Sequence, residues 1–199
     1  MEIAEGVSDL FLNYGFKSVN MDDIARHLGK SKRTIYQFFK DKKEVVEAVV
    51  SYSLEQDIKN IKAIQDKGLD AISESVEFTD YVFEKLKGIH PSIFFDLEKY
   101  YPKSWKMFLD FREGFVVECI KLNIDKGQKE GVYRKEIKGQ IIGSLYMGLM
   151  DQMFNYEVRG NDALPLTVVY KELTRYHLTG LANEKGYQQI QSLIEKDTL

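Results

Sequence analysis

The sequence predicts an all-α protein, and three observations support this fold class. Apolar residues recur at helical spacing along almost the whole chain, and no long stretch alternates like a strand. Only three prolines occur in 199 residues, at positions 91, 102 and 165, so few points forbid a helix. Hydrophobic residues make up 44% of the chain, which is enough for one or two compact domains. We therefore expect helices packed on one another through their apolar faces.

Capping residues mark the ends of the helices expected in the first part of the chain. Asn20, Ser31 and Asp41 are suitable N-caps, because their side-chain oxygens can accept hydrogen bonds from the first free backbone amides of a helix. Gly15 and Gly29 are suitable stops, because glycine readily adopts the left-handed conformation that ends many helices. These signals predict helices over residues 3–14, 21–28 and 32–39, then a long helix that passes residue 64.

The helical pattern continues through the rest of the chain. We expect a helix over residues 69–86, short helical pieces up to Tyr101, one long helix over 103–129, and helices over 137–156 and 166–181. The polar tail after Asn183 has a weak pattern and is expected to fray. Three short helices followed by a long one indicate a small N-terminal domain, residues 1–45, and a larger helical domain, residues 46–199.

Residues 21–39 have the spacing of a helix-turn-helix. Ala25 stands where the two helices cross, and Gly29 supplies the positive φ of the tight turn. Ile24, Leu28, Ile35 and Phe38 are expected to pack the two helices onto the first helix. An ordinary helical hairpin is the alternative, in which alanine and glycine only pack and cap. The side chains left on or near the outer face of the second helix are Lys32, Arg33, Thr34, Tyr36 and Gln37.

Charge is distributed unevenly along the chain. Residues 26–43 hold seven basic residues and one acid, whereas the remainder holds 21 basic and 30 acidic residues, so the net charge of -3 hides a basic segment. A run of charged residues often does no more than keep one face of a helix in contact with water. Its position on the helix-turn-helix favours an interface with a polyanion such as DNA.

These N-terminal residues resemble the signature of the TetR family of transcriptional regulators. The similar stretches are LFLNYGFKSVNMDDIA from Leu10 and GKSKRTIYQFFKDKKEVV from Gly29. The resemblance implies that Tyr36 and Lys42 touch DNA phosphates, and that Lys32 and Thr34 lie where relatives meet the DNA backbone or bases. It also implies a helical C-terminal domain that dimerises and binds a small effector, whose binding releases operator DNA.

Three features depart from the family pattern. Lys30 replaces a small apolar residue after the turn glycine, and it either extends its stem along the surface with the charge in water or adds a phosphate contact. Arg33 replaces a frequent glycine and either contacts a base or crowds the groove. The chain starts directly in its first helix, so minor-groove contacts from a basic arm are not expected.

The helices expected over 137–156 and 166–181 are candidates for a dimer interface. The first of these helices is apolar around most of its circumference. This favours contact with the core of its own chain on one side and with a second subunit on the other. Gly139, Gly143 and Gly148 allow another helix to come close, so Gly143→Leu is expected to favour a monomer. Alternatively, both helices belong to the core of a monomer. The resemblance favours a homodimer on a two-fold DNA site.

The central region is rich in aromatic residues. Aromatic walls with a few polar groups suit a pocket for a mostly apolar or planar ligand, although such a stripe is often plain core. The side chains that we expect to line the pocket are Phe78, Tyr81, Phe111, Phe115, Tyr146, Met150 and Phe154.

The sequence gives little support to catalysis or cofactor binding. His27, His90 and His177 are far apart, and no metal-ligand spacing, Gly-x-Ser-x-Gly or phosphate-cradling loop is present. We expect no catalytic residue, metal or cofactor. Cys119 is expected to be a buried, inert thiol, and a single cysteine fits a reducing compartment. No apolar run approaches the roughly 20 residues that cross a bilayer, and the acidic N-terminus is unlike a signal peptide, so a cytoplasmic location is expected.

Two other classes of protein remain open at this point. A helical enzyme would turn over a metabolite, and an interaction protein that kept the fold without DNA binding would leave DNA unshifted at low salt. The basic charge of the helix-turn-helix argues against both the enzyme and the interaction protein. The sequence therefore predicts a DNA-binding transcriptional regulator, and a repressor in particular, with double-stranded operator DNA, a small-molecule effector and a second copy of the chain as partners.

Overall fold

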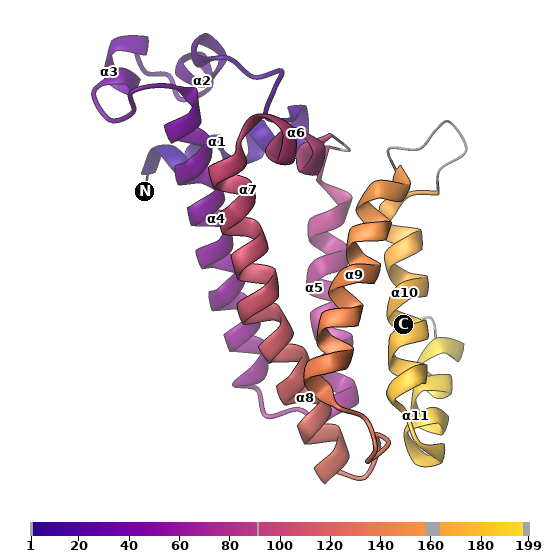
Figure 1. The fold of residues 1–199 in the computed structure, drawn as a ribbon. Coiled ribbons are helices and arrows are strands. Elements are labelled where there is room, and N and C mark those ends of the chain that lie inside the picture. The colour runs from indigo at the N-terminus through magenta and orange to yellow at the C-terminus, as the bar shows by residue number, and fades with distance from the viewer. Residues whose placement is uncertain (1, 91, 158–163, 197–199) are drawn as a thin grey trace. The chain divides into compact units, whose positions relative to one another are not determined.

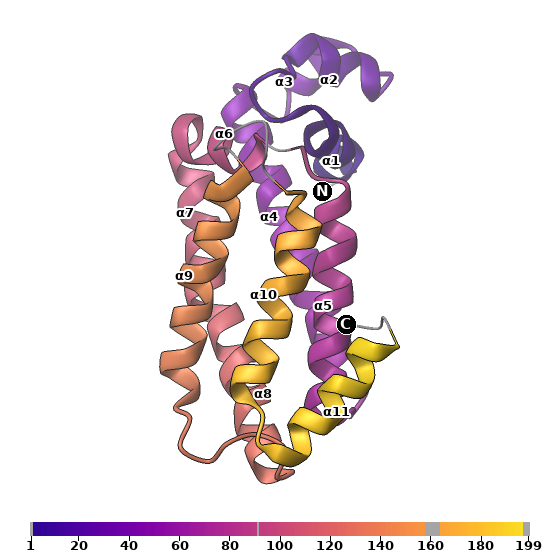
Figure 2. The same ribbon diagram turned by 90° about the vertical axis from the view of Figure 1, so that its right-hand side faces the viewer.

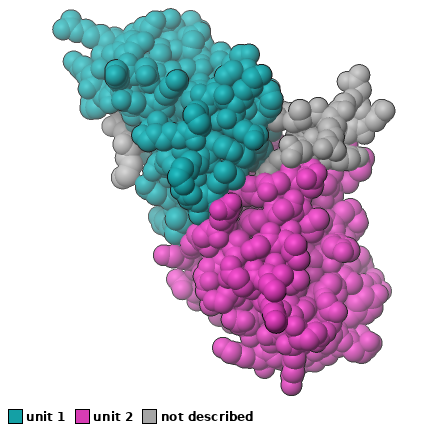
Figure 3. Space-filling model, viewed as in Figure 1, with its two compact units in different colours: residues 1–59, 88–111 teal, residues 60–87, 112–199 magenta. Residues whose placement is uncertain are grey.

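A computed structural model describes residues 2–90, 92–157 and 164–196, and most of these residues lie in helices (Figure 1). The predicted all-α class is confirmed. The chain divides into two compact units, one of residues 1–59 with 88–111 and one of residues 60–87 with 112–199 (Figure 3). These units are discontinuous in sequence, so they do not coincide with the expected boundary after residue 45. That boundary stays a prediction about the DNA-binding segment.

Unit 1 is built around a single apolar core. Val7 and Phe11 of the first helix meet Ile24, Ile35 and Val46 in this core, and all five side chains are fully buried. Such burial stabilises each side chain by about 1.5–3 kcal/mol. The helices of the unit are α1 (Glu2–Tyr14), α2 (Met21–His27), α3 (Lys32–Tyr36), the start of α4 (Lys42–Gln65), α6 (Ile93–Tyr100) and α7 (Pro102–Phe111).

Residues 88–111 join unit 1 through both polar and apolar contacts. The Asp96 carboxylate accepts a hydrogen bond of 2.9 Å from the backbone amide of Lys17, in the turn between α1 and α2. The Tyr101 hydroxyl donates to the Phe16 carbonyl at 3.4 Å, and Leu97 is buried in the same core. These contacts are distant in sequence, which is why the N-terminal unit extends beyond residue 45.

Phe38 was expected to pack against α1, and this prediction is wrong. The third helix ends at Tyr36 rather than Phe39, and a turn follows. Phe38 is 67% exposed as a result, while Phe39 packs against the core of unit 1. The turn after Tyr36 changes the direction in which successive side chains point. The helical pattern, continued beyond Tyr36, therefore selected Phe38 instead of Phe39 as the core residue.

Unit 2 is a set of long helices lying side by side (Figures 1 and 2). Ile72, Ile124, Tyr133, Leu178 and Ile190 are fully buried in its core. No helix among the described residues is both long and apolar enough to span a membrane. The helices of the unit are the end of α4, α5 (Ala71–Lys87), the π-helical turn η1 (Arg112–Val116), α8 (Val117–Lys129), α9 (Gly139–Glu157), α10 (Leu166–Leu181) and α11 (Glu184–Glu195).

Two elements of unit 2 differ from the sequence prediction. The single helix expected over residues 103–129 is interrupted by η1, where the buried Arg112 guanidinium donates to the Met147 carbonyl at 2.9 Å. π-Turns arise from one extra residue in a helix and have no strong sequence signal. The tail expected to fray forms α11 instead, because Asn183 caps it and Ile190 is fully buried.

Two glycines in α9 allow α8 of the same chain to approach closely. A Cβ atom on Gly143 would lie 3.1 Å from a Val117 methyl group, and one on Gly139 would lie 3.2 Å from the Lys121 backbone. A Cβ on Gly148 would meet nothing within 4 Å. The predicted close approach is therefore confirmed at the first two glycines. Gly143→Leu would disturb packing inside the chain, so it does not test a subunit interface.

Candidate DNA-binding surface and effector cavity

The start of α2 is held by a complete capping box. The Asn20 side chain accepts hydrogen bonds from the backbone amides of Asp22 and Asp23, at 2.8 and 3.0 Å. The Asp23 carboxylate in turn accepts from the Asn20 amide at 2.9 Å. This reciprocal pair satisfies amides that have no partner within the helix, and it confirms the predicted cap. It fixes where α2 begins and therefore how the following turn leaves it.

The turn between α2 and α3 has the geometry of a helix-turn-helix. Gly29 adopts a φ of 60°, which a residue with a side chain tolerates poorly, and the Lys30 amide donates to the Ala25 carbonyl at 3.0 Å. Ser31 then caps α3 by accepting from the Thr34 amide at 3.1 Å. Ala25 is buried between the helices, as predicted. The two helices are thus locked at a defined angle by local bonds.

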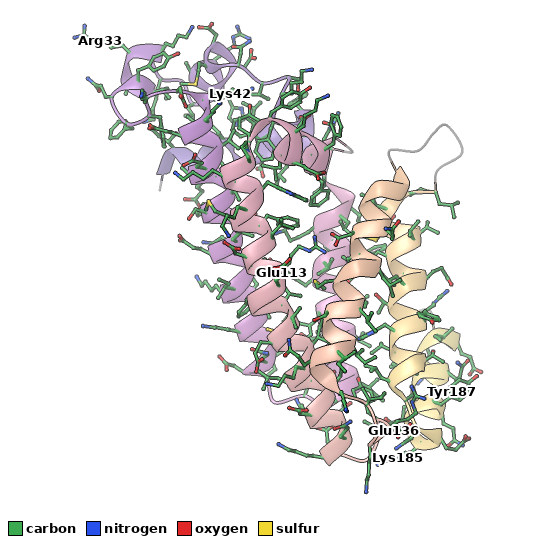
Figure 4. The ribbon with its side chains drawn as sticks, viewed as in Figure 1. Arg33, Lys42, Glu113, Glu136, Lys185 and Tyr187 are labelled. Atoms are coloured by element: carbon green, nitrogen blue, oxygen red, sulfur yellow. The ribbon has the colours of Figure 1, made fainter. Side chains whose placement is uncertain are left out.

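The outer side of α3 and its flanking turns carries the predicted DNA-binding residues. Arg33 projects outward from α3 (Figure 4), and Thr34 is half-buried, with its hydroxyl 2.8 Å from that of Ser31. A short helix with exposed cationic, amide and hydroxyl groups has the chemistry needed to reach phosphates and base edges in a major groove. The exposed residues of the predicted set are Lys30, Lys32, Arg33, Tyr36 and Gln37.

Two lysines of this surface already have partners within the chain. The Lys32 ammonium donates to the Asp22 carboxylate at 2.9 Å, and this hydrogen bond raises the pKa of Lys32. Lys42 is half-buried at the start of α4 and donates to the Lys17 carbonyl at 3.1 Å. Burial lowers the pKa of Lys42. Lys32 would therefore exchange a carboxylate for a phosphate on DNA, whereas Lys42 would keep a structural bond as well.

The predicted cap of α4 lies at the same surface. The Asp41 carboxylate accepts from the backbone amides of Lys43 and Glu44 at 2.8 and 3.1 Å, and the Glu44 carboxylate accepts from the Lys40 amide at 2.6 Å. These hydrogen bonds fix the N-terminus of α4, where free amides and the helix dipole favour an anion such as phosphate.

A cavity of ≈ 140 Å³ lies within unit 2. Most of its walls are aromatic or aliphatic, and they come from the end of α4 and from α5, η1, α8, α9 and α10. The polar side chains among its lining residues are Ser75, Thr79, Asn123 and Thr174, together with three tyrosine hydroxyls and His177.

The structure brings four of the seven predicted pocket residues to this cavity: Phe78, Tyr81, Tyr146 and Met150. Phe115 of η1 is not among the lining residues, and Phe111 belongs to unit 1. The side chain of Phe154 lies outside the described residues. Aromatic content alone selected Phe111 and Phe115, because a helical pattern does not reveal which side of a buried stripe faces a cavity. Ligand binding at the other four stays a prediction.

Sequence reasoning missed the polar side of the cavity on α10. Tyr170, Thr174 and His177 follow one another at helical spacing and all line the cavity. Burial lowers the pKa of His177 to about 4, so its imidazole is neutral at pH 7. Its ring lies 4.3 Å from that of Tyr146, between centroids. Polar residues within a buried stripe were the available signal.

Cys119 also lines the cavity, and burial raises the pKa of its thiol to about 11. A protonated thiol is a poor nucleophile, in keeping with the expected inert cysteine. Among the described residues, no group of three or more His, Cys, Asp or Glu side chains is arranged to hold a metal ion.

An apolar face of α9 and α10 is exposed in the single chain. On α9, Ile141, Leu145 and Leu149 recur every four residues and are exposed, which places them on one side of the helix. Val168 and Tyr176 are exposed on α10, which packs beside α9. Exposed apolar residues that share one side of a helix can form an interaction site. We name this set the α9–α10 face.

Comparison with known proteins agrees with this architecture. Residues 5–49 match the model of the family described as bacterial regulatory proteins, tetR family. The uncharacterised HTH-type transcriptional regulator YvaF of Bacillus subtilis is 27% identical over 146 residues, which cover 70% of this chain and 73% of that protein.

Solved structures share the fold over nearly the whole chain. A transcriptional regulator from Saccharomonospora viridis, in complex with choline, has a TM-score of 0.74 and 19% identity, covering 92% of this chain and 96% of that one. The regulator FadR from Bacillus subtilis, in complex with stearoyl-CoA, has a TM-score of 0.64 and 14% identity, covering 91% and 98%.

The matched family segment spans α1, α2, α3 and the start of α4, which are the elements that build the capped helix-turn-helix. The family consists of DNA-binding transcription factors rather than enzymes. The N-terminal segment over residues 5–49 is that of the tetR family of bacterial regulatory proteins, and the chain is a DNA-binding transcriptional regulator.

Proposed function

We propose that this regulator is a homodimeric repressor that binds an inverted-repeat operator and is released when a small effector occupies the cavity of unit 2. The observation that carries the proposal is the exposed cationic and polar side of α3, held on a helix-turn-helix by two capped helix starts. In a dimer, two copies of α3 would enter successive major grooves roughly 34–36 Å apart.

The proposed contacts divide into two kinds. Arg33 and Gln37 have donors and acceptors that match guanine and adenine edges, so we assign base reading to them. The remaining contacts position the protein on the DNA backbone through charge and hydroxyl groups, independently of sequence. These phosphate contacts are assigned to Lys30, Lys32, Thr34, Tyr36 and Lys42.

The α9–α10 face supports the proposed dimer. Each exposed apolar residue on it would be removed from water in an interface, and a two-fold axis makes every contact occur twice. The face combines Leu145 at 60% exposure with Tyr176 at 73%, which leaves much apolar area to bury.

The cavity supports the proposed effector site. The two structural neighbours bind choline and stearoyl-CoA respectively, so the fold holds small molecules of different chemistry. An effector moves the DNA-binding equilibrium only by its difference in affinity between the two conformations. A tenfold change in DNA affinity therefore requires about 1.4 kcal/mol of coupling, and the same factor must appear in effector affinity when DNA is bound.

Selection of bound DNA from a random pool tests the proposal. The purified chain should enrich an inverted repeat whose half-sites are about one helical turn apart. A reporter driven by a promoter that contains the selected repeat should then rise in expression when the regulator gene is deleted. Enrichment of a single, unrepeated half-site would overturn the dimer, and a fall in reporter expression would identify an activator.

A further inference from the structure

Three lysines of unit 1 lie in a row that leads from the start of α4 to the end of α6. The Lys42 ammonium donates to the Lys17 carbonyl at 3.1 Å, in the turn between α1 and α2. The Lys17 ammonium donates to the Tyr100 hydroxyl at 3.2 Å and lies 5.0 Å from the centre of that ring. The Lys99 ammonium lies 5.5 Å from the same ring centre. We name Lys42, Lys17, Tyr100 and Lys99 the lysine–tyrosine row.

The ammonium groups of the row are held by neutral groups rather than by carboxylates. Elsewhere in unit 1, Lys103 forms an ion pair with Glu47, and Lys106 forms one with Asp110. Within the described part of the chain, no carboxylate forms an ion pair with a lysine of the row. A carbonyl, a hydroxyl and an aromatic face orient a cation without cancelling its charge. The row therefore keeps its positive charge available to an anion.

Two acids lie beside the row without pairing with it. The Asp96 carboxylate is 4% exposed and accepts a hydrogen bond from the Lys17 backbone amide at 2.9 Å. Glu98 is exposed and precedes Lys99, but successive residues of a helix point about 100° apart. The potential at the row stays positive, because the hydrogen bond from Lys17 and the charges of Lys17 and Lys99 lower the pKa of Tyr100.

The position of the row favours DNA as its partner. Lys42, its first member, lies at the start of α4, where free amides and the helix dipole also favour phosphate. A DNA strand that reaches this point continues as a regular series of negative charges, one for about every 3.4 Å of helix axis. The row offers a series of positive charges that begins at the same point, so the two surfaces are complementary.

We propose that the Lys17 and Lys99 ammonium groups bind a DNA phosphate next to the start of α4 and so extend the DNA-binding surface onto α6. Of the about three phosphates that each copy neutralises, this pair binds about one. The inference rests on the proposed function, because it takes α3 and the start of α4 as the primary DNA contact. It adds a phosphate site outside the helix-turn-helix.

The experiment measures the salt dependence of DNA affinity for the full chain, by fluorescence anisotropy with the selected repeat. The wild-type slope of log K against log salt should be roughly -5. Lys17→Ala/Lys99→Ala removes about one phosphate contact per copy, so the slope should fall to roughly -3.5 and the affinity at about 0.15 M salt by about 10-fold to 100-fold. Lys17→Arg/Lys99→Arg keeps both charges and should keep the wild-type slope.

Lys103→Ala/Lys106→Ala is the matched control, because it also removes two exposed lysines from unit 1. These ammonium groups are already paired with carboxylates, so the control should leave the slope unchanged and the affinity within about twofold of wild type. All the replaced side chains are exposed, so every variant should melt within about 2 °C of wild type.

Ethylation of individual phosphates in the selected repeat locates the contact. In each half-site, one phosphate whose ethylation blocks wild-type binding should no longer affect the Lys17→Ala/Lys99→Ala variant. The phosphates contacted by α3 and by Lys42 should keep their effect on both proteins.

A slope near -5 for Lys17→Ala/Lys99→Ala, or an equal reduction in the control variant, would overturn the inference. An ethylation pattern identical to that of wild type would overturn it as well. The proposed function would survive each of these results, provided that the wild-type slope is near -5 and that Lys42→Ala reduces it. A wild-type slope near zero would instead refute both proposals.

Discussion

Leu145→Ala should weaken the dimer strongly if the α9–α10 face is the subunit interface. Leu145 leaves 60% of its surface in water in the single chain. Complete burial of a leucine side chain contributes about 1.5–3 kcal/mol, so the exposed part is worth about 1–2 kcal/mol per copy. Because each contact occurs twice about a two-fold axis, the dimer should lose about 2–4 kcal/mol. This loss corresponds to an increase of about 30-fold to 700-fold in the dimer dissociation constant.

Sedimentation equilibrium over a range of concentrations measures this constant. Leu122→Ala is the matched control, because Leu122 is 50% exposed but belongs to α8 rather than to α9 or α10. The control should leave the dissociation constant within about twofold of wild type. Equal behaviour of the two variants, or a larger effect of Leu122→Ala, would show that the interface lies elsewhere.

Three further predictions concern DNA contacts and pH. Lys42→Ala should weaken binding to all DNA sequences alike and reduce the salt dependence, because it removes about one phosphate contact per copy; filter binding at several salt concentrations measures both. Arg33→Ala and Gln37→Ala should each relax preference at one base position by about 1–3 kcal/mol, and a repeated DNA selection showing the wild-type preference would place base reading elsewhere. Burial lowers the pKa of His177 to about 4, below its ordinary value of 6.5. As the pH falls from 6.5 to 4, the unfolded chain therefore binds a proton at His177 before the folded chain does, and the free energy of unfolding decreases. Between pH 7.5 and pH 5, urea unfolding should show wild type losing about 2 kcal/mol more than His177→Gln.

Local signals predicted the helix-turn-helix well because short-range bonds build it. Asn20, Ser31 and Gly29 act within four residues of their partners, so their spacing in the sequence is nearly their spacing in space. The exception was Phe38, where a turn of two residues changed the side that the ring faces. The helix predicted over residues 21–28, between Asn20 and Gly29, ends within one residue of its predicted position.

Features that depend on tertiary contacts could not be predicted from the chain alone. The C-terminal tail forms α11 because Ile190 is buried in the core of unit 2, although the sequence of the tail is mostly polar. Residues 88–111 join unit 1 through Asp96 and Tyr101, whose partners lie about 80 residues away. The polar wall at Thr174 and His177 faces a cavity whose existence depends on five helices and a π-turn together. Periodicity identifies a buried stripe but not the space beside it.

The salt dependence of DNA affinity tests the account most directly. A dimer that neutralises about 6 phosphates should show log K falling against log salt with a slope of roughly -5. Fluorescence anisotropy with the selected repeat, from low to physiological salt, measures this slope on the full chain. A slope near -5 is the predicted result. A slope near zero would contradict the claim that the cationic side of α3 and the start of α4 bind the DNA backbone.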